Sequence, residues 1–211
     1  MSIPPATRAE QQVQTRERLV DAAARVFARR GYHAATLAEV AREAGYSTGA
    51  VYSNFSGKED LFLALADRQI AGRAEQARAV AKFAPEDPWA DAGLLEQAIA
   101  AWLRSFTEEN EEWPLLFYEF WSYGVRNAEL RSEFEARRTA AREAIAGPLA
   151  EAAASRGLRL RYPAEELAAA LSGVINGLAF ERTVDPDSMS ERVAAFVVST
   201  ILRESFEEPQ R

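Results

Sequence analysis

The chain has 211 residues, of which 25 are Lys or Arg, 32 are Asp or Glu, one is His and none is Cys. An apolar fraction of 48% and a charged fraction of 27% are typical of a globular protein and exclude a wholly disordered chain. The lack of cysteine excludes disulfides, thiolate catalysis and cysteine-ligated zinc, and a single histidine argues against a histidine metal site or a catalytic triad. We therefore expect no catalytic residues, no metal and no cofactor.

Charge is divided unevenly along the chain. The formal net charge is −7, yet residues 1–60 carry eight positive and seven negative side chains, so the excess of acid lies in the remaining residues. The first thirty residues contain six arginines and no apolar signal segment, and no stretch approaches about eighteen uninterrupted apolar residues. These features predict a cytoplasmic protein with no membrane span, and the asymmetry suggests two segments with different tasks.

Apolar residues recur at helical spacing throughout, and no segment alternates with a period of two. We expect an all-α protein of about nine helices, with residues 1–12 and 207–211 frayed. Gly31 and Gly45 end the first two helices, and Asp87-Pro88 begins the fifth. Three capping boxes are expected, at Thr36/Glu39, Ser56/Glu59 and Ser188/Glu191. The predicted helices cover about 13–30, 36–44, 48–54, 57–83, 88–107, 111–125, 128–155, 163–184 and 189–206.

The most informative segment runs from residue 45 to residue 58. Two short helices with a tight turn between them form a helix-turn-helix, whose second helix would enter the major groove of DNA. Its outward side offers Thr48, Tyr52 and Ser53, while Gly49 has no side chain to keep the backbone from the groove. Lys58 begins the fourth helix, where free N–H groups and an ammonium both favour a phosphate. The same spacing also occurs in helical proteins that never touch DNA, and Tyr52 could instead pack on the first helix.

At this point the sequence resembles a known family. Residues 16–65, through Gly31-Tyr32, Thr36, Ala41-x-x-Ala44-Gly45, Ser47-x-Gly49, Tyr52-x-x-Phe55 and Lys58-x-x-Leu61, look like the DNA-binding domain of the tetracycline-repressor (TetR) family. The resemblance implies a helix-turn-helix DNA-binding domain over residues 1–60 and a helical ligand-binding and dimerisation domain over 61–211. It implies a homodimeric transcription regulator, a repressor, that a small molecule releases from a palindromic operator of double-stranded DNA.

The resemblance also assigns roles by position. Residues that would face bases are Thr48, Gly49 and Ala50, and residues that would hold the DNA backbone are Thr36, Ser47, Tyr52, Asn54 and Lys58. Asn54 departs from the family pattern, in which His or Tyr is more frequent at this position.

Aromatic residues concentrate in 102–123, which holds eight of the 21 in the chain. Trp113, Phe117 and Trp121 follow i, i+4, i+8 spacing and so share one helix face. This pattern favours an apolar ligand pocket, although the same residues could simply fill a helical core. The candidate ligand-binding residues are Trp102, Phe106, Trp113, Phe117, Phe120 and Trp121.

The last two predicted helices carry small and apolar residues that would allow close helix packing. By resemblance these helices pair with their copies in a four-helix dimer interface, and the alternative is burial within one subunit. The candidate interface residues are Leu171, Gly173, Val174, Gly177, Leu178, Val193, Phe196, Val197 and Thr200.

Three classes of function remain at this stage: a ligand-responsive DNA-binding regulator, an enzyme, and a small-molecule sensor that binds no DNA. An enzyme is disfavoured because the sequence has no recognisable catalytic constellation. If the chain is a DNA-binding regulator, its affinity for duplex DNA should fall steeply with salt. If it is a small-molecule sensor that binds no DNA, it should show no salt-dependent affinity for any duplex. In the regulator, a ligand near the aromatic cluster would tilt the long fourth helix and separate the two recognition helices of the dimer.

Overall fold

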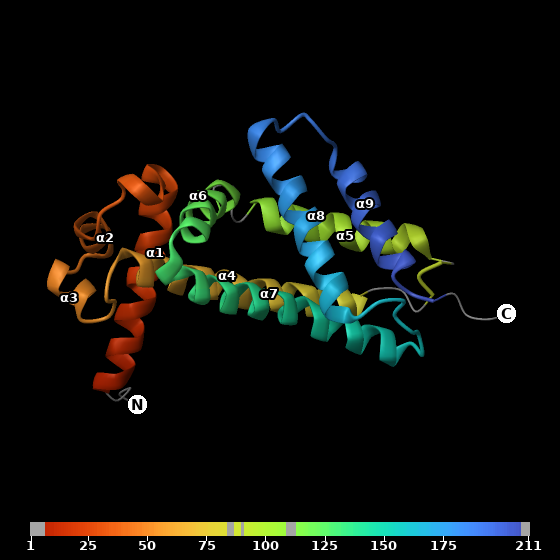
Figure 1. Cartoon of the computed structure of the whole chain (residues 1–211), viewed down its shortest axis with the longest axis horizontal. Helices are drawn as coiled ribbons and strands as arrows, with labels where there is room; N and C mark the ends of the chain where they lie inside the picture. The colour runs from red at the N-terminus through yellow and green to blue at the C-terminus, as the bar shows by residue number, and fades with distance from the viewer. Residues whose placement is uncertain (1–6, 84–86, 90, 109–112, 208–211) are drawn as a thin grey trace, which may run out of the picture. The chain divides into compact units, whose positions relative to one another are not determined.

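The computed structural model describes residues 7–83, 87–89, 91–108 and 113–207, and within them the chain is all-helical, with nine helices (Figure 1). This confirms the predicted fold class. No described helix has both the length and the apolar character needed to cross a membrane. The helices are α1 (Arg8–Ala34), α2 (Leu37–Ala44), α3 (Thr48–Tyr52), α4 (Lys58–Phe83), α5 (Ala92–Glu108), α6 (Trp113–Arg126), α7 (Ala128–Ser155), α8 (Ala164–Val184) and α9 (Glu191–Glu204).

The chain divides into two compact units, Met1–Gln69 and Ile70–Arg211, and the division falls within α4. The first three turns of α4 therefore belong to unit 1 and the remainder to unit 2. Unit 1 comprises α1, α2 and α3 together with those turns.

Unit 1 is organised around three aromatic rings. Phe27, Tyr32 and Phe62 are almost completely buried, and each pair of rings lies with centroids 5.3–5.8 Å apart. Gly31 leaves the helical conformation at φ 74°, in the left-handed region that glycine adopts without steric cost, so α1 is broken where the sequence predicted its end. This break turns Tyr32 into the core.

The ends of the helices in unit 1 follow the predicted capping pattern in part. Thr36 and Glu39 form the expected capping box at the start of α2. The first helix, however, begins at Arg8 rather than near residue 13, because Thr7 and Glu10 form a capping box that the sequence analysis missed. Residues 8–12 are therefore helical and not frayed.

Three other helix starts differ from the prediction by a few residues. Ser56 pairs with Asp60 rather than Glu59, because α4 begins at Lys58 and Asp60 thus occupies its third position. Asp87 caps a turn by accepting from the N–H of Trp89, and α5 starts only at Ala92. Helix α9 is capped by Ser190, whose hydroxyl accepts from the N–H of Val193, rather than by the predicted Ser188.

In unit 2, α5 packs on α9, α7 packs on α8, and α6 contacts both α7 and α8. Helices α6 and α7 approach very closely at Gly124, where a Cβ atom would lie 2.8 Å from the Phe134 ring. The apolar core of this unit is built from α5, α7, α8 and α9 and contains Leu95, Ile99, Leu103, Leu149, Ala153, Leu167, Leu171, Ile175, Ala194, Ala195, Val198 and Phe206.

Candidate functional site

Helices α2 and α3 form the predicted helix-turn-helix. Gly45 ends α2 in the left-handed conformation at φ 74°, which produces the tight turn between the two helices. Val51 and Phe55 face inward and are at most 2% exposed. On the opposite side of α3, Thr48 and Gly49 are exposed and Tyr52 is 61% exposed. Tyr52 is therefore not buried in the core, and α3 presents small and hydroxyl side chains to solvent.

The other residues of this region use their side chains locally. Ser47 is the N-cap of α3, and its hydroxyl accepts from the N–H of Ala50 at 3.2 Å. Ser53 and Asn54 both donate to the carbonyl of Ala50, at 2.9 and 2.8 Å, so these two polar groups turn back onto the helix. Thr36 is engaged in the capping box of α2. The freely projecting side chains of the surface are therefore those of Thr48 and Tyr52.

Lys58 lies at the first position of α4 but reaches back to the end of α1. Its ammonium donates to the carbonyl oxygens of Tyr32, His33 and Ala35 at 2.9, 3.0 and 3.1 Å. It also lies 4.7 Å from the centroid of the Tyr32 ring. Because an ammonium has three N–H donors, all of them are used in these bonds. In this structure Lys58 closes the C-terminal end of α1.

Arginines of α1 hold α2 in place. Arg25 and Arg29 both contact the carboxylate of Glu43, at 2.9 and 2.7 Å, and their hydrogen bonds hold the pKa of Glu43 below its ordinary value. Arg30 lies 3.4 Å from Glu39. Arg42, in the last turn of α2, is exposed and forms no ion pair with the described residues. Arg42 was not among the predicted DNA contacts, although its place in the last turn before Gly45 is a signal for a phosphate contact.

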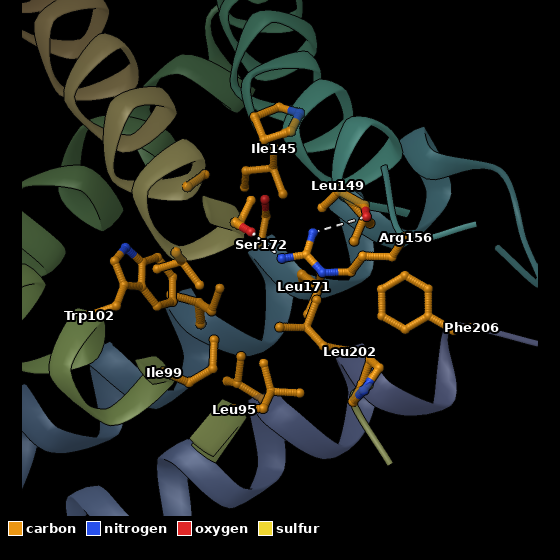
Figure 2. A pocket seen from close by; sticks show the side chains of 18 of the residues that line it. Leu95, Ile99, Trp102, Ile145, Leu149, Arg156, Leu171, Ser172, Leu202 and Phe206 are labelled. Carbon is orange, nitrogen blue, oxygen red and sulfur yellow. Dashed lines mark hydrogen bonds between the residues drawn. The ribbon is translucent and has the colours of Figure 1, made fainter. Parts of the chain in front are cut away.

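Unit 2 contains a partly open cavity of about 120 Å³. Figure 2 shows the side chains that line it. Its walls are mainly aliphatic, and side chains from five helices contribute to them. Leu95, Ile99 and Trp102 come from α5, and Phe206 follows α9 (Figure 2). The lining residues are Ala77, Val80, Ala81, Pro88, Leu95, Ile99, Trp102, Ile145, Pro148, Leu149, Ala152, Arg156, Leu171, Ser172, Ile175, Asn176, Val198, Leu202 and Phe206.

Three polar side chains interrupt this apolar wall. The guanidinium of Arg156 extends among the apolar residues in Figure 2 and donates to the carbonyls of Ala152 and Ala81, at 3.1 and 3.0 Å. Ser172 is buried and Asn176 half-buried, one turn apart on α8. Polar groups few in number within an apolar cavity are the usual composition of a small-molecule site, because they fix the orientation of a ligand that apolar contacts retain.

The structure separates the aromatic residues that the sequence grouped as one pocket. Among the predicted residues whose side chains the structure describes, Trp102 alone lines the cavity, whereas Trp113 and Phe120 are buried where α6 packs on its neighbours. Phe117 is half-buried against Trp113, and Trp121 is 41% exposed on another part of α6. The side chain of Phe106 lies outside the described residues. The cavity is thus lined mainly by aliphatic residues that were not predicted from the sequence. The sequence signal that could have located it is the pair Ser172 and Asn176, two polar residues four apart in an apolar helix.

The predicted dimer residues also divide into groups. Gly173, Val193 and Phe196 are exposed, and Val193 and Phe196 are large apolar side chains at 49% and 55% exposure. Leu171 instead is buried and lines the cavity, so it does not lie on the outer surface of α8. The half-buried members are Val174, Gly177, Leu178, Val197 and Thr200. Two further apolar residues at the end of α8 are exposed, Phe180 and Val184.

Comparison with known proteins connects these two units with one family. Residues 19–65 match the model of bacterial regulatory proteins of the tetR family. Residues 92–207, more than half of the chain, match the C-terminal domain of BetI-type transcriptional repressors. The chain belongs to the TetR family. It is a DNA-binding transcriptional regulator, and since the family consists of regulators, the prediction that it is not an enzyme is confirmed.

Individual TetR-family proteins support the same assignment. The transcriptional repressor AcnR of Corynebacterium efficiens is 29% identical over 167 residues, which cover 78% of this chain and 80% of AcnR. A solved TetR-family regulator from Mesorhizobium loti matches with a TM-score of 0.72 and 18% identity, covering 95% of this chain and 99% of that one. FadR of Bacillus subtilis, solved in complex with stearoyl-CoA, matches with a TM-score of 0.66 and 19% identity over 90% of this chain and 99% of FadR. These two structures show that the TetR fold extends over both units.

Proposed function

We propose that this TetR-family regulator is a cytoplasmic homodimeric repressor that binds a palindromic operator and leaves it when a small apolar molecule fills the cavity of unit 2. In this proposal residues 1–60 bind DNA and residues 61–211 bind the ligand and the second subunit. The observation that carries the DNA-binding part is the two-sided character of α3, in which Val51 and Phe55 are buried while Thr48 and Tyr52 project into solvent.

The proposed DNA contacts follow from what each exposed group can do. Thr48, Gly49 and Ala50 occupy the first turn of α3, the part of a recognition helix that reaches base edges. Tyr52 and Arg42 can donate to phosphate oxygens, because their polar ends are exposed. The side chains of the remaining predicted backbone contacts, Thr36, Ser47, Asn54 and Lys58, are engaged within the protein, so we propose that these residues position the surface. The backbone N–H groups of Thr36 and Asn54 are engaged as well, by Glu39 and by the carbonyl of Val51.

The chemistry of the ligand follows from the cavity. Aliphatic side chains form most of its wall, with Trp102 the aromatic contribution from the predicted set. This composition favours an alkyl-rich molecule over a flat aromatic one, since branched aliphatic walls pack closely around a flexible chain. FadR, which shares the fold, binds stearoyl-CoA, a ligand with a long alkyl chain. Arg156, Ser172 and Asn176 would orient the polar end of the ligand.

Coupling between the two sites would pass through α4. Ala77, Val80 and Ala81 in the second half of α4 line the cavity, while its first turns belong to unit 1. We propose that a ligand that displaces these three residues shifts α4, and that this shift changes the spacing of the two recognition helices in the dimer. Operator half-sites lie at a fixed helical spacing, so a change of a few Å prevents simultaneous docking. Linkage requires that operator DNA weaken ligand binding by the same factor.

The proposed dimer uses the exposed outer residues of α8 and α9. Val193 and Phe196 on α9, and Val184 at the end of α8, are large apolar side chains that are 49–65% exposed in one subunit. Phe180 on α8 is 37% exposed and also contacts the ring of Tyr118. Gly173 and Gly177 on α8 would let a partner helix approach closely. Exposed apolar surface of this kind on an otherwise charged protein marks an association site.

The function is tested by footprinting the purified protein on the DNA that flanks its own gene. We expect protection of a palindromic site, with an affinity that falls as salt rises. A variant with Thr48 replaced by Ala should change the preferred base at one position in each half-site. If the protein protects no site and its duplex affinity is independent of sequence, the chain is not the operator-specific repressor that we propose.

A further inference from the structure

A second hollow lies between α6 and α7 and shares no lining residue with the first cavity. Its volume is about 540 Å³, a size typical of small-molecule sites. The repressor function proposed above does not use it. We call it the arginine cleft, and its lining residues are Trp121, Gly124, Val125, Arg131, Phe134, Glu135, Arg138, Thr139 and Arg142.

The cleft has an excess of positive charge. Arg131, Arg138 and Arg142 are separated by seven and four residues and thus lie along one face of α7. Glu135 is the acidic residue of the lining, so the lining carries a net charge of +2. In the part of the chain that the structure describes, none of the three arginines forms an ion pair, whereas the adjacent Arg137 contacts Glu133 at 2.6 Å.

Two of the three guanidinium groups are held by hydrogen bonds to uncharged oxygens, which do not neutralise their charge. Arg131 donates to the carbonyl of Val125 at 3.1 Å, and Arg142 donates to the hydroxyl of Thr139 at 3.0 Å. Each guanidinium has five N–H donors, so these bonds leave most of the donors available. Burial, together with the nearby charge of Arg142, lowers the pKa of Arg138 below its ordinary value. A half-buried cation next to another cation is unfavourable, and an anion bound between them would relieve this repulsion.

An aromatic surface adjoins these charges. Trp121 lines the cleft from α6 and is 41% exposed, so part of its indole is available to a ligand. Phe134 lines the cleft from α7, and its ring lies 5.5 Å from that of Phe120 in the core. An exposed indole beside arginines can stack on a flat ring while the guanidinium groups bind an anion.

We propose that the arginine cleft binds a phosphate-bearing small molecule with a flat ring, of which a nucleoside diphosphate is the simplest representative. Guanidinium groups match phosphate oxygens through paired N–H donors, and three of them surround one hollow here. The hydroxyl of Thr139 adds a donor at the same place. This proposal does not depend on DNA binding or on the ligand of the first cavity.

Calorimetric titration of the full chain with ADP, inorganic pyrophosphate and adenosine tests the proposal. We expect ADP and pyrophosphate to bind with an affinity that falls with salt, and adenosine to bind much more weakly. Arg138→Gln and Arg142→Gln should each weaken both phosphate-bearing probes by about tenfold or more, since each removes charged hydrogen bonds. Arg137→Gln is the matched control and should change the affinity less than about twofold, because Arg137 already pairs with Glu133.

Trp121→Ala tests the aromatic part separately. It should weaken ADP more than pyrophosphate, because pyrophosphate has no ring to stack. Equal losses for the two probes contradict the flat-ring assignment. The proposal as a whole is overturned if the wild-type chain shows neither heat nor a rise in Tm with millimolar ADP and pyrophosphate, or if Arg137→Gln weakens them as much as Arg138→Gln. The wild-type titrations decide the question even if a variant fails to fold.

Discussion

Replacement of Lys58 by methionine distinguishes between two roles for this residue. The sequence predicted a phosphate contact, whereas the structure gives its ammonium three carbonyl partners at the end of α1. Methionine keeps an unbranched apolar stem of similar length but removes the charge and all three donors. The change therefore affects DNA binding in the first case and the stability of unit 1 in the second.

The expected magnitude follows from these contacts. A hydrogen bond from a charged group contributes about 1.5–3 kcal/mol, and the three bonds share one ammonium, so their contributions do not simply add. The interaction with the Tyr32 ring, at 4.7 Å, adds about 0.5–1 kcal/mol. We expect the free energy of unfolding to fall by about 2–3 kcal/mol for Lys58→Met, which corresponds to about 4–12 °C in Tm for a chain of this length if it unfolds in one step.

Urea unfolding followed by circular dichroism, without DNA, measures this effect. Lys82→Met is the matched control, since Lys82 is the other lysine of the chain and lies exposed in the last turn of the same helix. If the two variants unfold at the same urea concentration, the carbonyl bonds of Lys58 do not stabilise the protein and the reasoning is refuted. A loss of about one unit in the salt dependence of DNA binding, with stability unchanged, would instead identify Lys58 as a phosphate contact.

Four further outcomes can be measured. Tyr52→Phe should weaken binding to operator and random duplexes alike, by about two- to tenfold in fluorescence anisotropy, because it removes one hydrogen bond to a phosphate. Ile99→Ala should enlarge the ligand cavity and lower the free energy of unfolding by about 2–5 kcal/mol in urea titrations; a near-neutral change would mean that the cavity wall is loosely packed. Phe196→Glu should shift the protein from dimer to monomer in analytical ultracentrifugation, and an unchanged dimer would place the interface elsewhere. The free energy of unfolding should fall as the pH drops below the ordinary pKa of glutamic acid, because Glu43 takes up a proton more readily in the unfolded chain than in the folded protein. Glu43→Gln should reduce this pH dependence in urea titrations. If the pH dependence is unchanged, the ion pairs of Glu43 with the two α1 arginines do not cause it.

The helix-turn-helix could be predicted because its signals are local. The turn at Gly45, the cap at Thr36 and the buried spacing of Val51 and Phe55 all lie within a few residues of the feature that they determine. The same holds for most of the long helices. The starts that were misplaced are those of α1, where the Thr7/Glu10 capping box was missed, of α5, where Asp87 caps only a turn, and of α9, where Ser188 and Ser190 lie close together.

The ligand cavity could not be located in this way because it depends on packing between distant helices. Aromatic residues of α6 were expected to line it, but α6 packs against α7 and α8, and Trp113 and Phe120 are used in that contact. The partners of Lys58 are 23 to 26 residues away in the sequence, so its role at the end of α1 was equally invisible. Spacing along one helix shows which residues share a face but not which neighbour that face meets.

The segment from Ser47 to Phe55 contains no charged residue. In the DNA contact proposed above, readout of bases by this segment would rely on hydroxyl, methyl and backbone groups, with which dissolved ions do not compete directly. Attraction to the duplex in general must come from charged groups outside it, and that part fades as ionic strength increases. The preference for operator over unrelated DNA should therefore persist at salt concentrations at which the total amount of bound DNA has already fallen. High salt should make this protein a weaker DNA binder but a more selective one.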